Sequence, residues 1–147
     1  MVATHPFLDH PGPIPFAHRG GAGDAPENTL LAFEHAVALG YRYLETDVHA
    51  TRDGVLLAFH DDRLDRVTDR TGVVAQLEHA VVAAARIGGS EPIPLLEDLL
   101  GAWPDVRLNV DAKDDATVAP LVEVIRRTDS LDRVCVGSFS SSRLVRI

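Results

Sequence analysis

The chain has 147 residues, of which 46% are hydrophobic and 24% are charged, and its formal net charge is -8. This length suits one domain with its own core rather than two domains. The net negative charge argues against nucleic acid as a partner, because nucleic-acid-binding proteins neutralise phosphates with clustered Lys and Arg. No apolar run approaches the ~18 residues of a membrane span, and residues 1–10 do not read as a signal peptide. We therefore expect no transmembrane segment and a cytoplasmic location.

Residues 1–13 contain three prolines and are expected to form a loosely ordered tail. The short apolar segment 14–17 predicts a strand that runs into a glycine-rich turn over residues 18–23. Glycines there permit positive φ angles and close backbone approach, so an anion could lie against N–H groups beside Arg19. The alternative is a plain turn, since the loop matches neither the Walker pattern nor the dinucleotide-binding fingerprint.

A helix is predicted to open at residues 26–29, with Asn28 as its N-cap. Leu30, Phe33 and Val37 follow at helical spacing, and Gly40 is expected at the C′ position.

The strand predicted over residues 43–49 carries two acids on one face. Side chains alternate along a strand, so Glu45 and Asp47 point the same way, about 7 Å apart. Two like charges at this spacing repel each other unless a cation lies between them, and a hard divalent metal is the simplest such cation. The alternative is a solvated face with no ligand. His49 lies on the same face, and we expect it to be a surface or loop residue.

A third parallel strand is predicted over residues 55–61, with His60 at its end beside Asp61. Helices are expected over residues 76–86 and 95–102. The segment 106–113 alternates apolar and polar residues, and Asp111 and Lys113 fall on its polar face. Lys113 is the only lysine among the 14 Lys and Arg residues. Two arrangements are possible. In an antiparallel sheet the polar face would lie in water. In a parallel barrel it would point inward, where only a functional site would justify buried polar side chains.

A helix over residues 116–128 requires Pro120 in its first turn, and a fifth strand over residues 134–138 precedes another helix from Ser140. This alternation predicts an α/β fold, an incomplete TIM-type β/α barrel with about five of eight parallel strands and helices on the outside. Active sites of such barrels lie at the carboxyl ends of the strands. The polar residues found there are His18, Glu45, Asp47, His60, Asp111 and Lys113.

These motifs resemble the glycerophosphodiester phosphodiesterase family. The matching elements, which agree in order and spacing over residues 14–139, are His18-Arg19-Gly20, Pro26-Glu27-Asn28-Thr29, Glu45-x-Asp47, Asp53-Gly54, His60-Asp61 and the later acid-x-Lys pair. The resemblance implies that residues 14–147 are the N-terminal portion of such a domain, ending in the helix after the fifth strand. It also implies hydrolysis of a glycerophosphodiester, a small-molecule substrate, to glycerol 3-phosphate and an alcohol.

Carried onto this sequence, the resemblance makes His18 and His60 the acid and base, and Glu45, Asp47 and Asp111 the ligands of a divalent metal. Arg19 and Lys113 would bind the substrate phosphate, and Glu27 and Asn28 would support the ligands. Three carboxylates suit Ca²⁺ or Mg²⁺, both of which prefer oxygen. Many relatives have Glu where this chain has Asp111, which leaves the metal preference open.

Other functions remain open at this point. A phosphodiester lyase of the phospholipase C or sphingomyelinase D kind uses the same barrel and two histidines. An inactive truncated fragment or a binding module is a further alternative. Because five strands cannot close a barrel, the first and fifth would expose unpaired edges, and we expect self-association through them.

Overall fold

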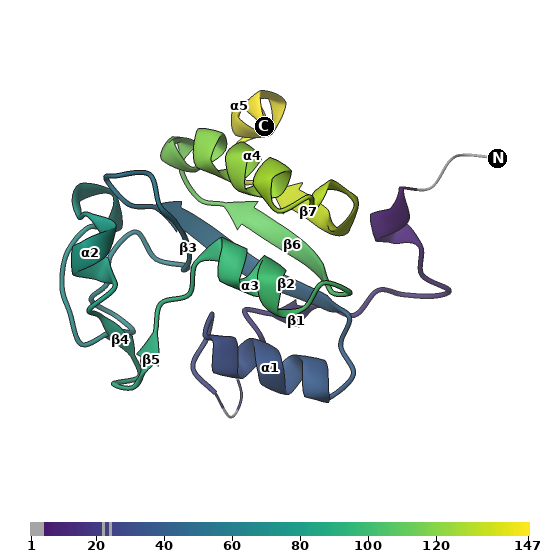
Figure 1. Cartoon of the computed structure of the whole chain (residues 1–147), viewed down its shortest axis with the longest axis horizontal. Helices are drawn as coiled ribbons and strands as arrows, with labels where there is room; N and C mark the ends of the chain where they lie inside the picture. The colour runs from purple at the N-terminus through teal and green to yellow at the C-terminus, as the bar shows by residue number, and fades with distance from the viewer. Residues whose placement is uncertain (1–4, 22, 24) are drawn as a thin grey trace.

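The computed structural model describes residues 5–21, 23 and 25–147. Its central element is a five-stranded sheet (Figure 1). Four strands run parallel, in the order β1 (Ala17–His18), β2 (Tyr43–Ala50), β6 (Arg107–Ala112) and β7 (Val134–Gly137). β1 and β7 are the two ends of this row, so the sheet is open. The incomplete β/α barrel predicted from the sequence is therefore confirmed.

The fifth strand of the sheet, β3 (Leu56–Ala58), runs antiparallel to β2, with Val48 opposite Ala58. The parallel direction predicted for this strand is wrong. A parallel crossover needs a connection of roughly a dozen residues, whereas the turn at Asp53 and Gly54 is tight, with Gly54 at φ 82°. The chain consequently folds back along β2 as a hairpin.

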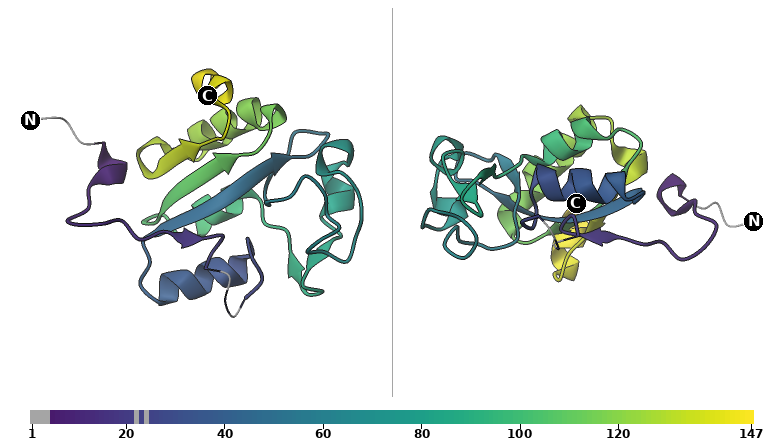
Figure 2. Two further views of the ribbon diagram at one scale, coloured as in Figure 1. Left: turned by 180° about the vertical axis from the view of Figure 1, so that it is seen from behind. Right: turned by 90° about the horizontal axis from the view of Figure 1, so that it is seen from below.

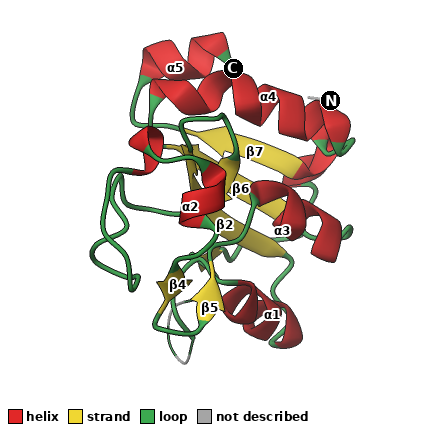
Figure 3. Ribbon diagram, turned by 60° about the vertical axis from the view of Figure 1, so that its left-hand side comes forward, coloured by secondary structure: helices red, strands yellow, loops and turns green. Residues whose placement is uncertain are grey.

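Helices cover one face of the sheet. They are α1 (Leu30–Ala38), α3 (Leu96–Ala102) and α4 (Val118–Arg127), and Figure 3 shows them along one side of the strands. Their apolar side chains form one buried cluster with Leu44, Val48, Leu108 and Val110. The short helix η3 (Asp115–Thr117) precedes α4 and places Pro120 in the first turn of α4, as predicted. Helix η4 (Leu131–Arg133) precedes β7, and α5 (Ser141–Arg146) follows β7.

The segment between β3 and α3 forms a second, smaller core at one end of the molecule (Figure 2). It contains η2 (Val74–Gln76), α2 (His79–Val82) and the paired strands β4 (Arg86–Ile87) and β5 (Glu91–Pro92). The helix expected over residues 76–86 is thus only the four residues of α2. Gly88 and Gly89, both at positive φ, turn the chain between β4 and β5.

The N-terminal segment contacts the sheet through Phe7, at the first residues of β2 and β6. The 3-10 helix η1 (Pro6–Leu8) buries Phe7, and the Tyr43 hydroxyl donates to the Phe7 carbonyl at 2.7 Å. Arg107 donates to the same hydroxyl at 2.9 Å. Of residues 5–13 in the predicted tail, only Phe7 is buried, with its ring edge-on to Tyr43, and the others are exposed; residues 1–4 lie outside the described residues.

Helix α1 begins one residue later than the sequence predicts. The N-cap is Thr29, whose hydroxyl accepts a hydrogen bond from the Ala32 N–H at 3.2 Å. Asn28, predicted as the cap, has φ 55° and points its side chain elsewhere. Gly40 follows the helix at φ 99°, as expected for the C′ position.

Substitutions in the glycine-rich turn test how β1 is held against α1. Both Gly20 and Gly21 have positive φ, but a Cβ on Gly20 would lie 2.8 Å from the Cβ of Ala32, whereas a Cβ on Gly21 meets nothing within 4 Å. We expect Gly21→Ala to cost about 1 kcal/mol of unfolding free energy through φ alone. Gly20→Ala should cost a further ~1–3 kcal/mol from overpacking. Equal losses in urea denaturation would contradict this packing.

Candidate active site

The polar face of the sheet is the face opposite the helices. In the register of β2 with β6, Glu45 lies beside Asn109 and Asp47 beside Asp111. The apolar neighbours Leu44 and Val48 point to the helix-covered core. Of the two arrangements that the sequence left open for residues 106–113, the parallel one with inward polar groups is therefore the one that forms.

Two histidines reach this face along a single edge of β2. One edge of β2 is paired with β6, so β1 and β3 both lie on the other edge. β1 brings His18 opposite Glu45, and the returning chain places the Phe59 N–H on the Asp47 carbonyl at 2.9 Å, directly before His60. His18 and His60 thus approach the two carboxylates from opposite directions, because β3 is antiparallel.

Asp47 is the most buried acid of the site, with its side chain 2% exposed. Lys113 Nζ lies 2.8 Å from Asp47 Oδ1 and 2.7 Å from Asp111 Oδ2, and Arg19 Nε lies 3.2 Å from Asp47 Oδ2. The Asn28 amide also donates to Asp47, at 3.2 Å. Burial alone would raise the pKa of Asp47, but the hydrogen bonds from Lys113 and Asn28 outweigh it and lower that pKa.

Glu45 is less well compensated. It accepts a hydrogen bond from the Arg19 backbone N–H at 3.1 Å and lies 3.8 Å from His18 Nε2. Burial, together with the neighbouring charge of Asp47, raises the pKa of Glu45. Asp111 Oδ1 is buried and has no hydrogen-bond partner among the described residues. Glu45 and Asp111 are therefore less fully compensated by positive charge and hydrogen bonds than Asp47.

A metal would have to be accommodated among these acids. No group of three or more His, Cys, Asp or Glu side chains in the described part of the chain is arranged as a metal site. Lys113 Nζ occupies the position between Asp47 and Asp111. The orphaned oxygen of Asp111 and the raised pKa of Glu45 nevertheless fit a further cation. Among the described residues, the basic side chains within 4.0 Å of these three carboxylates are those of Lys113, Arg19 and His18.

The ring of His60 is fixed by a neighbouring acid. His60 Nδ1 lies 2.6 Å from Asp61 Oδ1, and Arg66 binds both oxygens of Asp61, at 2.6 and 2.9 Å. Arg66 Nη2 also donates to Glu27 Oε1 at 2.6 Å, and Glu27 pairs with Arg19 at 3.2 Å. The family resemblance implies that Glu27 supports the ligands, but nothing in the sequence points to Arg66, because a single Arg in a long loop carries no periodic signal.

His49, expected on the surface, is buried instead. Its Nδ1 lies 2.8 Å from Asp114 Oδ2, and its Nε2 lies 3.0 Å from the His60 carbonyl. The position of His49 two residues after Asp47, on the same face of β2, was the signal that could have identified it.

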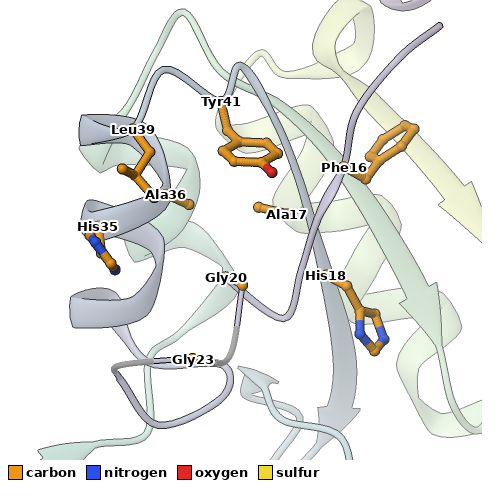
Figure 4. Close-up of a pocket in the computed structure, with 10 residues that line it drawn as sticks. Phe16, Ala17, His18, Gly20, Gly23, His35, Ala36, Leu39 and Tyr41 are labelled. Atoms are coloured by element: carbon orange, nitrogen blue, oxygen red, sulfur yellow. The ribbon is translucent and has the colours of Figure 1, made fainter.

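Two cavities border the strand ends. One, of about 290 Å³, is lined by Glu45, Asn109, Asp111, Gly137, Ser138 and Phe139 and lies on the polar face. The other, of about 490 Å³, lies between β1 and α1 (Figure 4). In that view the His18 ring points away from α1, whereas Ala36 and Leu39 line the helix side. The smaller cavity is lined by two of the three acids, Glu45 and Asp111, and is the one relevant to the chemistry.

The open row of parallel strands with helices on one face places the chain in the class of β/α-barrel folds. Sequence comparison identifies the family. The sequence model described as the glycerophosphoryl diester phosphodiesterase family matches residues 18–144. The probable glycerophosphodiester phosphodiesterase 2 of Mycobacterium tuberculosis is 46% identical over 141 residues, which are 95% of this chain and 53% of the relative. A glycerophosphodiester phosphodiesterase of Bacillus altitudinis is 34% identical over 144 residues, covering 88% of this chain and 59% of the relative.

Solved structures agree with the sequence comparison. A glycerophosphoryl diester phosphodiesterase domain from Mycobacterium tuberculosis superimposes with a TM-score of 0.83 at 30% identity, over 90% of this chain and 55% of that structure. A phosphodiesterase of Oleispira antarctica, solved with the product sn-glycerol-3-phosphate, gives a TM-score of 0.82 at 31% identity, over 89% and 59% respectively. This chain belongs to the glycerophosphodiester phosphodiesterase family.

The chain spans about half to three fifths of the length of the relatives just described. Within the described residues, none of the helices combines the length and apolar character that crossing a bilayer requires.

The ion pair beside His60 predicts a pH dependence of stability. The Arg66 guanidinium lowers the pKa of Asp61 to about 2. Because this value lies below the ~3.9 of an unfolded chain, Asp61 stabilises the fold above pH ~4, and this contribution is lost as the pH falls toward 2. Wild type should exceed Asp61→Asn in unfolding free energy by at most roughly 2 kcal/mol at pH 7. In denaturant titrations the difference should shrink between pH 4 and pH 2; a constant difference would contradict the ion pair.

Proposed function

We propose that this chain carries the acid-base and metal-binding half of a glycerophosphodiester phosphodiesterase active site, which hydrolyses a glycerophosphodiester to glycerol 3-phosphate and an alcohol. One observation carries the proposal: His18 and His60 converge on Glu45 and Asp47 along the same edge of β2. Family membership supports the substrate class, as does the product complex of the Oleispira antarctica relative.

The two histidines suit opposite roles in proton transfer. Nδ1 of His60 faces the Asp61 carboxylate, which would accept a hydrogen bond from the Nδ1–H group and leave Nε2 free toward substrate. His18 is largely exposed on the opposite side of the carboxylates, so it can reach the other oxygen of a phosphodiester. One imidazole would take the proton of the attacking hydroxyl while the other protonates the departing alcohol.

Glu45, Asp47 and Asp111 are the residues that would hold a divalent metal, Ca²⁺ or Mg²⁺, through oxygen. When bound, such a metal supplies positive charge for the phosphate oxygens. Arg19 and Lys113 line the same face and add positive charge, which stabilises negative charge that develops on a phosphate during the reaction. Glu27 and Asn28 keep Arg19 and Asp47 in place. The cytoplasmic location and self-association through the sheet edges stay predictions.

Histidine variants test the acid-base roles. We expect His18→Ala and His60→Ala each to lower the release of glycerol 3-phosphate from glycerophosphocholine by at least ~100-fold, with folding and metal binding retained. His79→Ala is the matched control, since His79 lies in α2, outside the site, and should keep the wild-type rate. Near-wild-type rates in either site variant would remove its assigned role. Accumulation of a stable cyclic phosphate in place of glycerol 3-phosphate would favour a lyase.

Metal removal tests the carboxylates. We expect a chelator to abolish activity, and Ca²⁺ or Mg²⁺ to restore it. Glu45→Gln and Asp47→Asn should each weaken metal binding in calorimetry, because each removes one charged oxygen ligand. Glu97→Gln, an exposed substitution on α3, should leave the affinity unchanged. Unchanged affinity in both site variants would rule out this metal site.

A further inference from the structure

Arg66 occupies an unusual position for an exposed arginine. It lies in the loop after β3, and its guanidinium holds two carboxylates that are 34 residues apart in sequence, Asp61 and Glu27. It donates to both oxygens of Asp61, at 2.6 and 2.9 Å, and to both oxygens of Glu27, at 2.6 and 3.4 Å. This use of the planar guanidinium fixes each carboxylate in orientation as well as in position.

One of these two carboxylates, that of Asp61, contacts His60 directly. Asp61 Oδ1, the oxygen that accepts from Arg66 Nη2 at 2.9 Å, also lies 2.6 Å from His60 Nδ1. Among the described residues, Asp61 has no other side-chain hydrogen-bond partner than His60 and Arg66. Glu27, on the other side, is anchored by Arg19 at 3.2 Å. Arg66 is therefore the only direct link described between the acid that orients His60 and the part of the site that carries Arg19.

We propose that Arg66 is a positioning residue for His60, which holds the Asp61 carboxylate so that His60 keeps its proton on Nδ1 and presents Nε2 to the substrate. The inference rests on the proposed function, in which His60 transfers a proton. Glu27, which is held by Arg19, in turn keeps the Arg66 guanidinium in place. Without Arg66, Asp61 is free to rotate away, and the imidazole loses the partner that selects its tautomer.

The alternative is an ordinary surface ion pair, and the same loop offers a direct comparison. Arg66 is 50% exposed, and exposed ion pairs add little to stability. Arg63, three residues earlier, is equally exposed at 50% and pairs with Asp65 at 3.3 Å, but none of the described contacts links that pair to His60. If exposure and charge alone mattered, the loss of Arg63 and the loss of Arg66 would have the same effect.

The test compares Arg66→Met, Arg66→Lys and the matched control Arg63→Met in the full chain. The first measurement is the tautomer of His60, read from long-range ¹H–¹⁵N correlations and assigned by comparison with His60→Ala. Wild type and Arg63→Met should show the Nδ1–H form. Arg66→Met should show a mixture of both tautomers, and Arg66→Lys should lie in between, because one ammonium cannot bind both oxygens of Asp61 and both of Glu27.

The second measurement is the steady-state release of glycerol 3-phosphate from glycerophosphocholine. We expect Arg66→Met to lower kcat by about 10- to 100-fold with KM nearly unchanged, partial recovery in Arg66→Lys, and wild-type kinetics in Arg63→Met. If the wild-type chain releases no product, the proposed function fails for this chain, while the tautomer measurement still decides the role of Arg66. A His60 tautomer in Arg66→Met equal to that in Arg63→Met would overturn the inference, whatever the change in kcat.

Discussion

The rest of the site depends on the compensation of one buried carboxylate. Asp47 is almost fully enclosed, and a buried ionised acid is tolerated only when it is paired and hydrogen-bonded. Its partners come from three distant segments: Arg19 after β1, Asn28 before α1, and Lys113 at the end of β6. Pairing with Asp47 therefore holds these three segments next to one another at the site. Glu45 has no such set of partners, and its burial together with the nearby charge of Asp47 raises its pKa.

Beside this centre, a chain of hydrogen-bonded side chains extends outward from His60. His60 is oriented by Asp61, Asp61 by Arg66, and Arg66 by Glu27. Such chains of alternating charge keep side chains in place while leaving the cavity side open to a ligand. The short antiparallel return of β3 is what makes this arrangement possible, because it brings His60 back toward the middle of β2. A longer parallel crossover would place that histidine on a different strand, away from the edge that β1 shares.

Much of the fold was readable from the sequence, because periodicity and turn residues are local signals. The alternation in residues 106–113 marked β6, and Gly40 marked the end of α1. The errors occurred where tertiary contacts outweighed local preference. Asn28 is a good N-cap residue by type, but its side chain donates to Asp47 and accepts from the Thr46 hydroxyl at 2.8 Å, so Thr29 takes the cap. The apolar segment after Gln76 has helical character, yet only α2 is helical there and the chain then enters β4. Its apolar residues pack into the second, smaller core instead of along one helix face.

The sequence by itself determined which residue types are present, on which strand they lie and which face they share, since these follow from a period of two along each strand. It placed His18, Glu45, Asp47 and Asp111 at the ends of parallel strands, whereas its placement of His60 rested on a parallel direction for β3 that is wrong. Only the tertiary structure decided how their charges are distributed: that a lysine lies between two acids, that β3 runs backward, and that one loop arginine reaches two carboxylates. Strand direction depends on the length of a connection, and charge pairing depends on side chains far apart in the chain, so neither leaves a local pattern to read.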